Sequence, residues 1–259
     1  SILSFVGIVC TRLMAENPTI PAVVWLLLAI ALGALCGAFN GLIVGYFKMV
    51  PMIATLGTMY IFRGLAFLVS GGQWWFPHQF TEGYQKFATL RIMGVPTILF
   101  FVLIVFILAA VFLGHTSSGR RIYAIGTSKE SSKVAGIKEA KVTFYAMVIC
   151  GALAGLSGML YTANYATGSY GIGEGYEMTA ISICILGGVS INGGKGKVDG
   201  VFLGFIMMSI ITYFISLLPG LSVWSDALQG AIIIAAVVMN LYTERSAEKR
   251  ALKERGALI

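Results

Sequence analysis

Long apolar segments separated by short polar connections make up most of this 259-residue chain. Most of them approach the roughly 20 residues that a helix needs to cross a bilayer, and none alternates as barrel strands do. We therefore expect an all-α fold, a polytopic integral membrane helical bundle of about seven complete spans plus a truncated first one. The apolar segments are residues 1–14, 22–47, 51–70, 96–114, 143–163, 178–191, 200–217 and 224–242.

The composition supports the same class. Hydrophobic residues make up 58% of the chain and charged residues 11%, whereas soluble domains carry about 25% charged residues. The four cysteines (Cys10, Cys36, Cys150 and Cys184) fall inside apolar segments, which favours reduced core residues over a disulfide framework. Two isolated histidines offer no metal constellation, and we expect no metal site.

Positive charge indicates the orientation. Most of the 18 Lys and Arg residues lie near Lys48 and within residues 114–142, 192–199 and 243–259. The positive-inside rule places these sections in the cytoplasm. We expect a single transmembrane domain over residues 1–259, with a cytoplasmic loop at 115–142 and a cytoplasmic tail at 243–259. The outer loop at 71–95 carries Trp74, Trp75 and Phe76, which fit an interfacial aromatic belt or, alternatively, a sugar-stacking surface.

Glycines recur at fourfold spacing in three of the apolar segments. This spacing places small residues on one helix face and allows the backbones of neighbouring helices to approach closely. We interpret these residues as packing positions rather than as a conduction pathway. They are Gly33, Gly37, Gly41 and Gly45 in one segment, Gly151 and Gly155 in another, and Gly200 and Gly204 in a third.

The charged loop contains residues that are typical of the two ends of a short helix. Thr127 and Glu130 have the spacing of a capping box, and Gly136 followed by Ile137 is typical of a helix C-terminus. About eight helical residues remain between them, roughly 12 Å of helix. Such a short helix is marginal alone, so we expect a surface against which another subunit docks. An ordinary capped turn that packs on the chain's own helix ends is the alternative.

Catalytic motifs are missing from the sequence, and we expect no enzymatic activity on this chain. The glycine- and lysine-rich run at 193–197 lacks the spacing and the Ser or Thr of a phosphate-binding loop, and we interpret it as a tight cytoplasmic turn. Inside the apolar segments the ionisable groups reduce essentially to Arg63. This scarcity argues against a proton-driven carrier and implies an energy source elsewhere.

A few polar residues within the segments could line a route for a hydroxyl-rich solute. We hypothesise that Arg63 and Glu177 pair at the outer end, since burying either charge alone is expensive; separate helix-end locks are equally consistent. The other candidates are Asn40, Thr55, Thr58, Asn164 and Asn240, for which interhelical hydrogen bonding is the alternative.

Several stretches, taken together, resemble the membrane permeases of ribose-type bacterial ABC sugar importers. They occur in the right order over most of the chain. They are residues 119–126, 134–137 and 151–158, residues 54–58 followed by Arg63 and Gly64, and Glu177 followed by residues 185–188.

The resemblance implies a permease of the bacterial inner membrane with about ten helices, of which this chain would lack the first two and part of a third. It also implies a second permease copy or paralogue, a periplasmic sugar-binding protein, and cytoplasmic ATPase subunits that hold the ATP and Mg; it implies no cofactor on this chain and no nucleic acid. The coupling helix of such permeases maps onto Thr127, Ser128, Lys129, Glu130, Ser131, Ser132, Lys133, Ala135, Gly136 and Ile137. Of these, Lys129, Ser131, Ser132, Lys133 and Ala135 are our candidates for the partner-facing surface.

Three other functions remain open from the sequence. Branched-chain amino-acid ABC permeases have a similar architecture, although residues 119–126 favour the sugar branch. A secondary carrier or channel would need no partner ATPase, and the shortage of carboxylates inside the spans speaks against it. A membrane scaffold has no positive support.

Overall fold

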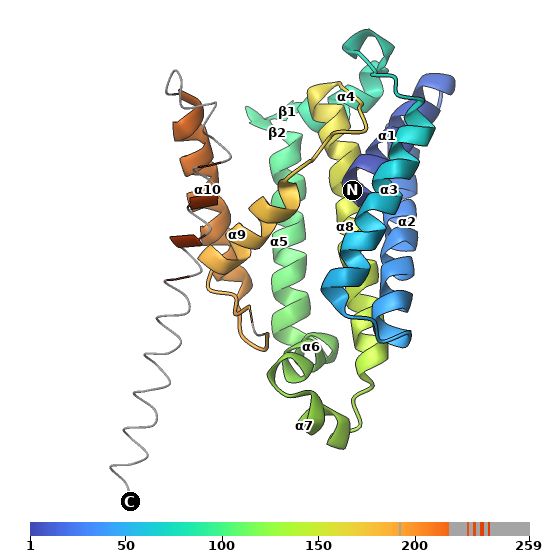
Figure 1. Ribbon diagram of the computed structural model, residues 1–259. Coiled ribbons are helices and arrows are strands. Elements are labelled where there is room, and N and C mark those ends of the chain that lie inside the picture. Colours follow the sequence, from blue (N-terminus) through green and yellow to red (C-terminus); the bar gives the residue numbers. More distant parts are fainter. Residues whose placement is uncertain (192, 218–226, 228–229, 232–233, 236–237, 239–259) are drawn as a thin grey trace, which may run out of the picture. The chain divides into compact units, whose positions relative to one another are not determined.

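The computed structural model describes residues 1–191, 193–217, 227, 230, 231, 234, 235 and 238. It divides the chain into two compact units, one of residues 1–108 with 129–174 and the other of residues 109–128 with 175–259. The expected helical fold is confirmed, with a two-stranded hairpin besides the helices (Figure 1). The predicted apolar segment at 224–242 and the tail at 243–259 fall outside the described residues, apart from a few isolated positions.

The first unit is built on four helices that run alongside one another: α1 (Ile2–Glu16), α2 (Ala22–Gly41), α3 (Pro51–Ser70) and α8 (Glu139–Tyr165) (Figure 1). Helix α2 continues into the π-helix η1 (Leu42–Tyr46). Pro51 begins α3, because the first helical position needs no N–H donor. Helix α1 forms the centre of the core, with Val6, Ile8, Cys10 and Met14 fully buried.

Glycine contacts hold α2 against α8. A Cβ atom on Gly33 would lie 2.9 Å from Gly155 Cα, and one on Gly37 would lie 3.0 Å from Gly151 Cα. Farther along, Gly41 approaches Phe144 and Gly45 approaches Ala140. The glycines assigned to packing from the sequence therefore lie at close backbone approaches, and any larger residue there would push the helices apart.

Smaller elements cover one end of the first unit. After the 3₁₀ turn η2 (Pro77–Gln79), the short helix α4 (Glu82–Thr89) buries Tyr84, whose hydroxyl lies 2.8 Å from Thr162 Oγ1 on α8. A hairpin of β1 (Arg91–Ile92) and β2 (Val95–Pro96) follows, with Ile92 paired to Val95. Its turn residues, Met93 and Gly94, both have positive φ, which is the requirement of a type I′ turn.

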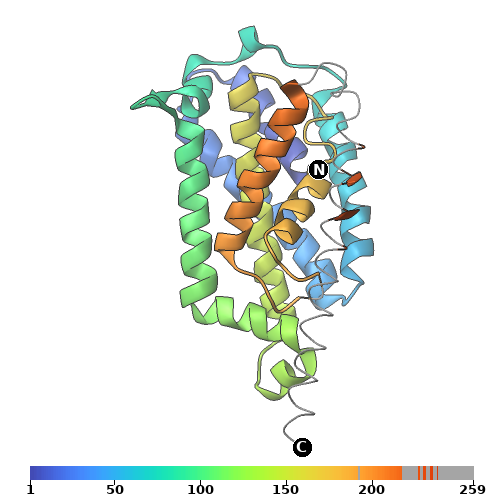
Figure 2. The ribbon, with the colours of Figure 1, turned by 90° about the vertical axis from the view of Figure 1, so that its left-hand side faces the viewer.

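Helix α5 (Thr97–His115) belongs to both units, which divide after Leu108. The second unit also contains α6 (Ser117–Thr127), α9 (Tyr176–Leu186) and α10 (Val198–Leu217). Helices α9 and α10 pack together, with Gly200 and Gly204 of α10 close to Gly187 at the end of α9. In Figure 2, α9 and α10 appear in light and dark orange.

Five helices in the described part of the chain are long and apolar enough to cross a membrane: residues 22–46 (α2 with η1), α3, α5, α8 and α10. Helix α1 has 15 residues and α9 only 11. The sequence placed the α9 segment at 178–191. The helix instead begins at Tyr176 and ends at Leu186, because Gly187 and Gly188 turn the chain, the latter with positive φ.

Candidate coupling segment and solute route

Helix α7 (Lys129–Val134) has six residues rather than the expected length of about eight, and the predicted glycine follows two residues after its end. Gly136 has a φ of 77°. Its N–H donates to the Lys133 carbonyl at 3.0 Å, and the Ile137 N–H donates to the Ser132 carbonyl at 2.9 Å. This pair of hydrogen bonds is the Schellman arrangement. The predicted C-terminal cap is therefore confirmed.

The predicted capping box at the other end is wrong. Thr127 is the last residue of α6, and its hydroxyl donates to the Tyr123 carbonyl at 2.9 Å instead of accepting from Glu130. Threonine hydroxyls readily bond the carbonyl one turn earlier in a helix, and this local bond competes with capping. The sequence analysis also missed α6, although Thr116 caps it by accepting from the Gly119 N–H at 3.1 Å.

Exposure corrects the candidate docking surface. Lys129, Lys133 and the small residues Ser131 and Ala135 are exposed as expected, but Ser132 is buried, with 5% of its surface accessible. Val134, which the sequence analysis did not single out, is 91% exposed. Val134 lies on the same short helix as the exposed Lys129 and Lys133.

An ion pair connects α7 to the start of α8. Lys129 Nζ lies 2.7 Å from Glu139 Oε1, and Glu139 is the first residue of α8. Both side chains are at least half exposed, so the pair contributes only about 0–1 kcal/mol to stability. The pair matters for the position of α7, because it connects α7 to α8, the helix that packs along α2.

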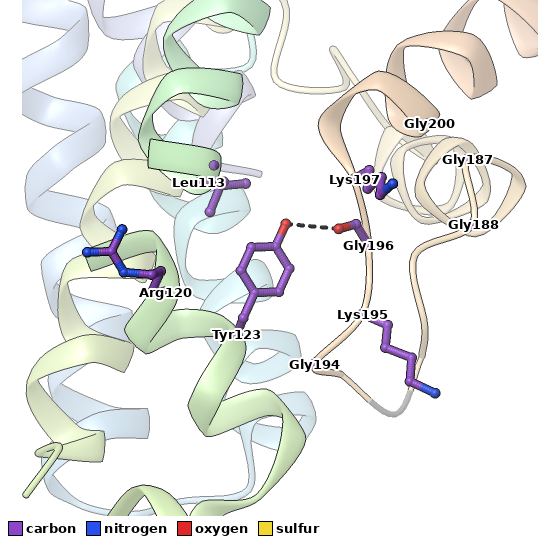
Figure 3. A pocket seen from close by; sticks show the side chains of 11 residues that line it. Leu113, Arg120, Tyr123, Gly187, Gly188, Gly194, Lys195, Gly196, Lys197 and Gly200 are labelled. Carbon is purple, nitrogen blue, oxygen red and sulfur yellow. Dashed lines mark hydrogen bonds between the residues drawn. The ribbon is translucent and has the colours of Figure 1, made fainter. Parts of the chain in front are cut away.

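In the second unit, α6 contacts the loop between α9 and α10. The Tyr123 hydroxyl donates to the Gly196 carbonyl at 3.0 Å (Figure 3). Gly126 approaches the backbone of Gly194 so closely that a Cβ on Gly126 would lie 2.9 Å from Gly194 Cα. Gly193 and Gly194 both have positive φ, which confirms the tight turn predicted for this run. A cavity of about 740 Å³ lies here, lined among others by Leu113, Arg120, Lys195 and Lys197.

Arg63 has a carboxylate partner that the sequence hypothesis did not name. Within the described residues, Arg63 Nη1 lies 3.1 Å from Glu174 Oε1, and both belong to the first unit. Glu177 is an exposed residue in the first turn of α9, in the second unit. The two carboxylates are three residues apart, and sequence spacing alone did not distinguish them.

The remaining route candidates that the structure describes lie on three helices of the first unit, α2, α3 and α8. Asn40 is buried near the end of α2, and its Oδ1 has no hydrogen-bond partner among the described residues. On α3, the hydroxyls of Thr55 and Thr58 donate to carbonyls of their own helix, at 2.9 Å (Pro51) and 3.1 Å (Thr55). Asn164 is half-buried on α8, and Asn240 lies outside the described residues.

Of the three aromatic residues at 74–76, Trp75 has a structural role. It is buried and forms a backbone bridge to Gly168, with N–H to carbonyl distances of 2.9 and 3.2 Å. Trp74 and Phe76 are exposed, which is consistent with either an interfacial aromatic belt or a sugar-stacking surface. Within the described residues, no three His, Cys, Asp or Glu side chains are arranged to hold a metal ion. All four cysteines are free thiols.

Residues 3–237 match the family described as "Branched-chain amino acid transport system / permease component". The chain belongs to this family. Among curated relatives, the ribose import permease protein of Escherichia coli is 32% identical over 93% of this chain and 75% of the relative. The galactose/methyl galactoside import permease protein of Escherichia coli is 32% identical over 88% of this chain and 70% of the relative.

The autoinducer 2 import system permease protein of Salmonella choleraesuis is 31% identical over 83% of this chain. The matched region spans 61% of that relative's length. No solved structure matches the chain. The recognised family therefore agrees with the resemblance seen in the sequence motifs, and the permeases named here handle sugars or an autoinducer rather than amino acids.

Proposed function

We propose that the chain is the transmembrane permease subunit of an ATP-driven importer that moves a monosaccharide or a related polyol-like solute across the bacterial inner membrane. The observation that carries the proposal is the 32% identity to a ribose import permease over 93% of the chain. The branched-chain amino acids of the family's description are the alternative substrate class. The names of the relatives favour sugars.

The proposal requires partners. A cytoplasmic ATPase subunit would bind and hydrolyse ATP with Mg, a periplasmic binding protein would deliver the solute, and a second permease copy or paralogue would complete the route. This chain would hold no cofactor and carry out no chemistry. Its C-terminus and the helices α6 and α7 would face the cytoplasm, because the positively charged connections favour that side.

Helix α7 is the element on which the ATPase would act. Val134 would insert into the partner, flanked by the positive charges of Lys129 and Lys133. The Schellman cap at Gly136 fixes the direction of the chain as it leaves the helix. The Lys129–Glu139 pair would carry displacement into α8. Because glycine contacts hold α8 against α2, the two helices would move together.

The solute route would use the polar groups that the spans leave unsatisfied. The orphan Oδ1 of Asn40 is an acceptor for a hydroxyl hydrogen. The hydroxyls of Thr55 and Thr58 retain acceptor capacity after donating to their own helix. Neutral hydrogen-bonding groups of this kind suit an uncharged, hydroxyl-rich solute better than an ion.

The test is reconstitution in proteoliposomes with the partner ATPase inside and the solute-loaded binding protein outside. We expect uphill uptake of radiolabelled D-ribose or D-galactose that requires ATP, and no uptake when the ATPase carries a substitution of its catalytic glutamate. Uptake of leucine instead of sugar would establish the amino-acid alternative. Uphill transport by this chain alone on an ion gradient would refute the proposal.

A further inference from the structure

Arg63 occupies an unusual position. Within the five helices long enough to cross a membrane it is the only Asp, Glu, Lys or Arg more than three residues from a helix end. It lies seven residues before the end of α3, about 10 Å along the helix axis. A charge at such a depth is expensive, and charged residues that persist there usually serve the transported solute or ion.

The segment at 166–175 brings Glu174 to Arg63. Three contacts fix it to the first unit: the Trp75–Gly168 bridge, a hydrogen bond of 2.7 Å from Ser4 Oγ to the Tyr170 carbonyl, and an edge contact between the rings of Phe67 and Tyr170. Gly173 has a positive φ of 70° immediately before Glu174. A residue with a Cβ would adopt this turn only with strain. The three contacts and the turn at Gly173 thus hold the Glu174 carboxylate close to Arg63 on α3.

The pairing is incomplete. An ion-pair contact of 3.1 Å joins Arg63 Nη1 to Glu174 Oε1, while the Nε of Arg63 is buried without a partner among the described residues. The Glu174 side chain is 74% exposed and the Arg63 side chain 22%. If the pair had only a structural role, we would expect every N–H donor of the guanidinium to have a partner. An ion pair with so exposed a carboxylate also adds little net stability. The free donor and the open carboxylate leave hydrogen-bonding capacity for a third group.

We propose that Arg63 and Glu174 form a recognition site for neighbouring hydroxyl groups of the transported solute. This proposal rests on the sugar-importer function above. The guanidinium would donate to hydroxyl oxygens, and the carboxylate would accept hydrogen bonds from hydroxyl hydrogens. Charge-assisted hydrogen bonds of this kind are the strong ones. The exposed ring of Phe67 lies one turn beyond Arg63 on α3 and contacts the exposed ring of Tyr170 in the segment at 166–175. The two rings would cover the apolar face of a sugar ring.

The matched test compares Glu174→Gln with Glu82→Gln, which removes an exposed carboxylate from another ion pair of the first unit. The complete importer is reconstituted, and initial uptake is measured with saturating loaded binding protein for D-ribose and 2-deoxy-D-ribose, or for D-galactose and its 2-deoxy analogue. We expect Glu174→Gln to lower uptake of the parent sugar about tenfold or more, the loss expected for a hydrogen bond to a charged group. Uptake of the deoxy sugar should change less than threefold, and Glu82→Gln should match the wild type.

A structural role predicts a different pattern. An equal proportional loss for the parent and deoxy sugars, or an equal effect of Glu82→Gln, would overturn the recognition site. The double variant Arg63→Glu/Glu174→Arg provides a second check if the single variants fold poorly. It restores an ion pair, so its melting temperature should recover while its discrimination between the two sugars stays lost. Recovery of discrimination would also refute the site. Because wild-type uptake is measured in parallel, a failure of the importer function itself is recognised separately.

Discussion

The ammonium of Lys129 lies 2.7 Å from the carboxylate of Glu139, across the bend between α7 and α8. We predict that Glu139→Gln lowers the amount of solute imported per ATP hydrolysed at least threefold, because α7 is no longer tied to α8. The unfolding free energy should fall by less than about 1 kcal/mol, since the pair is exposed. The control is Lys141→Ala, an exposed charge in the first turn of α8. Equal import per ATP in Glu139→Gln and the wild type would contradict the prediction.

Gly136→Val should uncouple ATP hydrolysis from uptake while leaving the protein in the membrane. A Cβ at Gly136 would meet no atom within 4 Å, so the substitution acts only through its φ of 77°. A β-branched residue pays a high cost there, whereas asparagine tolerates left-handed conformations. Gly136→Asn is therefore the control, and it should retain most of the uptake. Similar behaviour of the two variants in ATPase and uptake assays would argue against the role of the cap.

Val134→Asp should weaken binding of the ATPase subunit about tenfold or more, because it places a charge in an apolar contact. The isolated permease should melt at an unchanged temperature, since the side chain is 91% exposed. Affinity can be measured by surface-immobilised permease in detergent, with Ser131→Asp as the control for added negative charge on the same helix. An unchanged dissociation constant would remove Val134 from the interface.

Gly37→Val should destabilise the first unit, because its Cβ would lie 3.0 Å from Gly151 Cα and still closer to the Met147 carbonyl. Overpacking of this kind costs about 1–3 kcal/mol. Gly64→Val on α3 is the matched control, since a Cβ there meets nothing within 4 Å. Thermal unfolding of the detergent-solubilised protein measures both variants. A melting temperature for Gly37→Val equal to that of the control would contradict the close packing of α2 on α8.

Tyr84→Phe should cost about 0.5–1.5 kcal/mol, the usual net value of one hydrogen bond. The lost bond joins the Tyr84 hydroxyl to Thr162 Oγ1 at 2.8 Å. Burial raises the pKa of Tyr84 and outweighs the opposite effect of the Thr162 contact, so the hydroxyl stays protonated throughout the usual working range. Thr162 keeps its bond to the Met159 carbonyl at 3.0 Å, which limits the loss. The decrease in melting temperature should be accompanied by unchanged helical circular dichroism.

Features that depend on local chemistry could be predicted from the sequence. Hydropathy located the helices of the first unit, fourfold glycine spacing located the α2–α8 contact, and Gly136 marked a helix end. Thr127 was misassigned because a threonine can cap the next helix or bond back into its own, and only the surrounding turn decides which. Arg63 was recognised as a charge that needs a partner. Glu174 was not identified, because its approach depends on an anchored loop and a positive φ at Gly173 that spacing does not encode.

The π-helix at the end of α2 bears on how motion could pass through the first unit. Its signature bond runs from the Phe47 N–H to the Leu42 carbonyl, 3.1 Å across five residues. A π-turn accommodates one residue more than an α-turn. Tightening it to ordinary helical bonding would therefore rotate everything beyond Tyr46 by about 100° around the helix axis. The extra residue in η1, which begins two residues after Asn40, therefore corresponds to a discrete rotation between α2 and the start of α3.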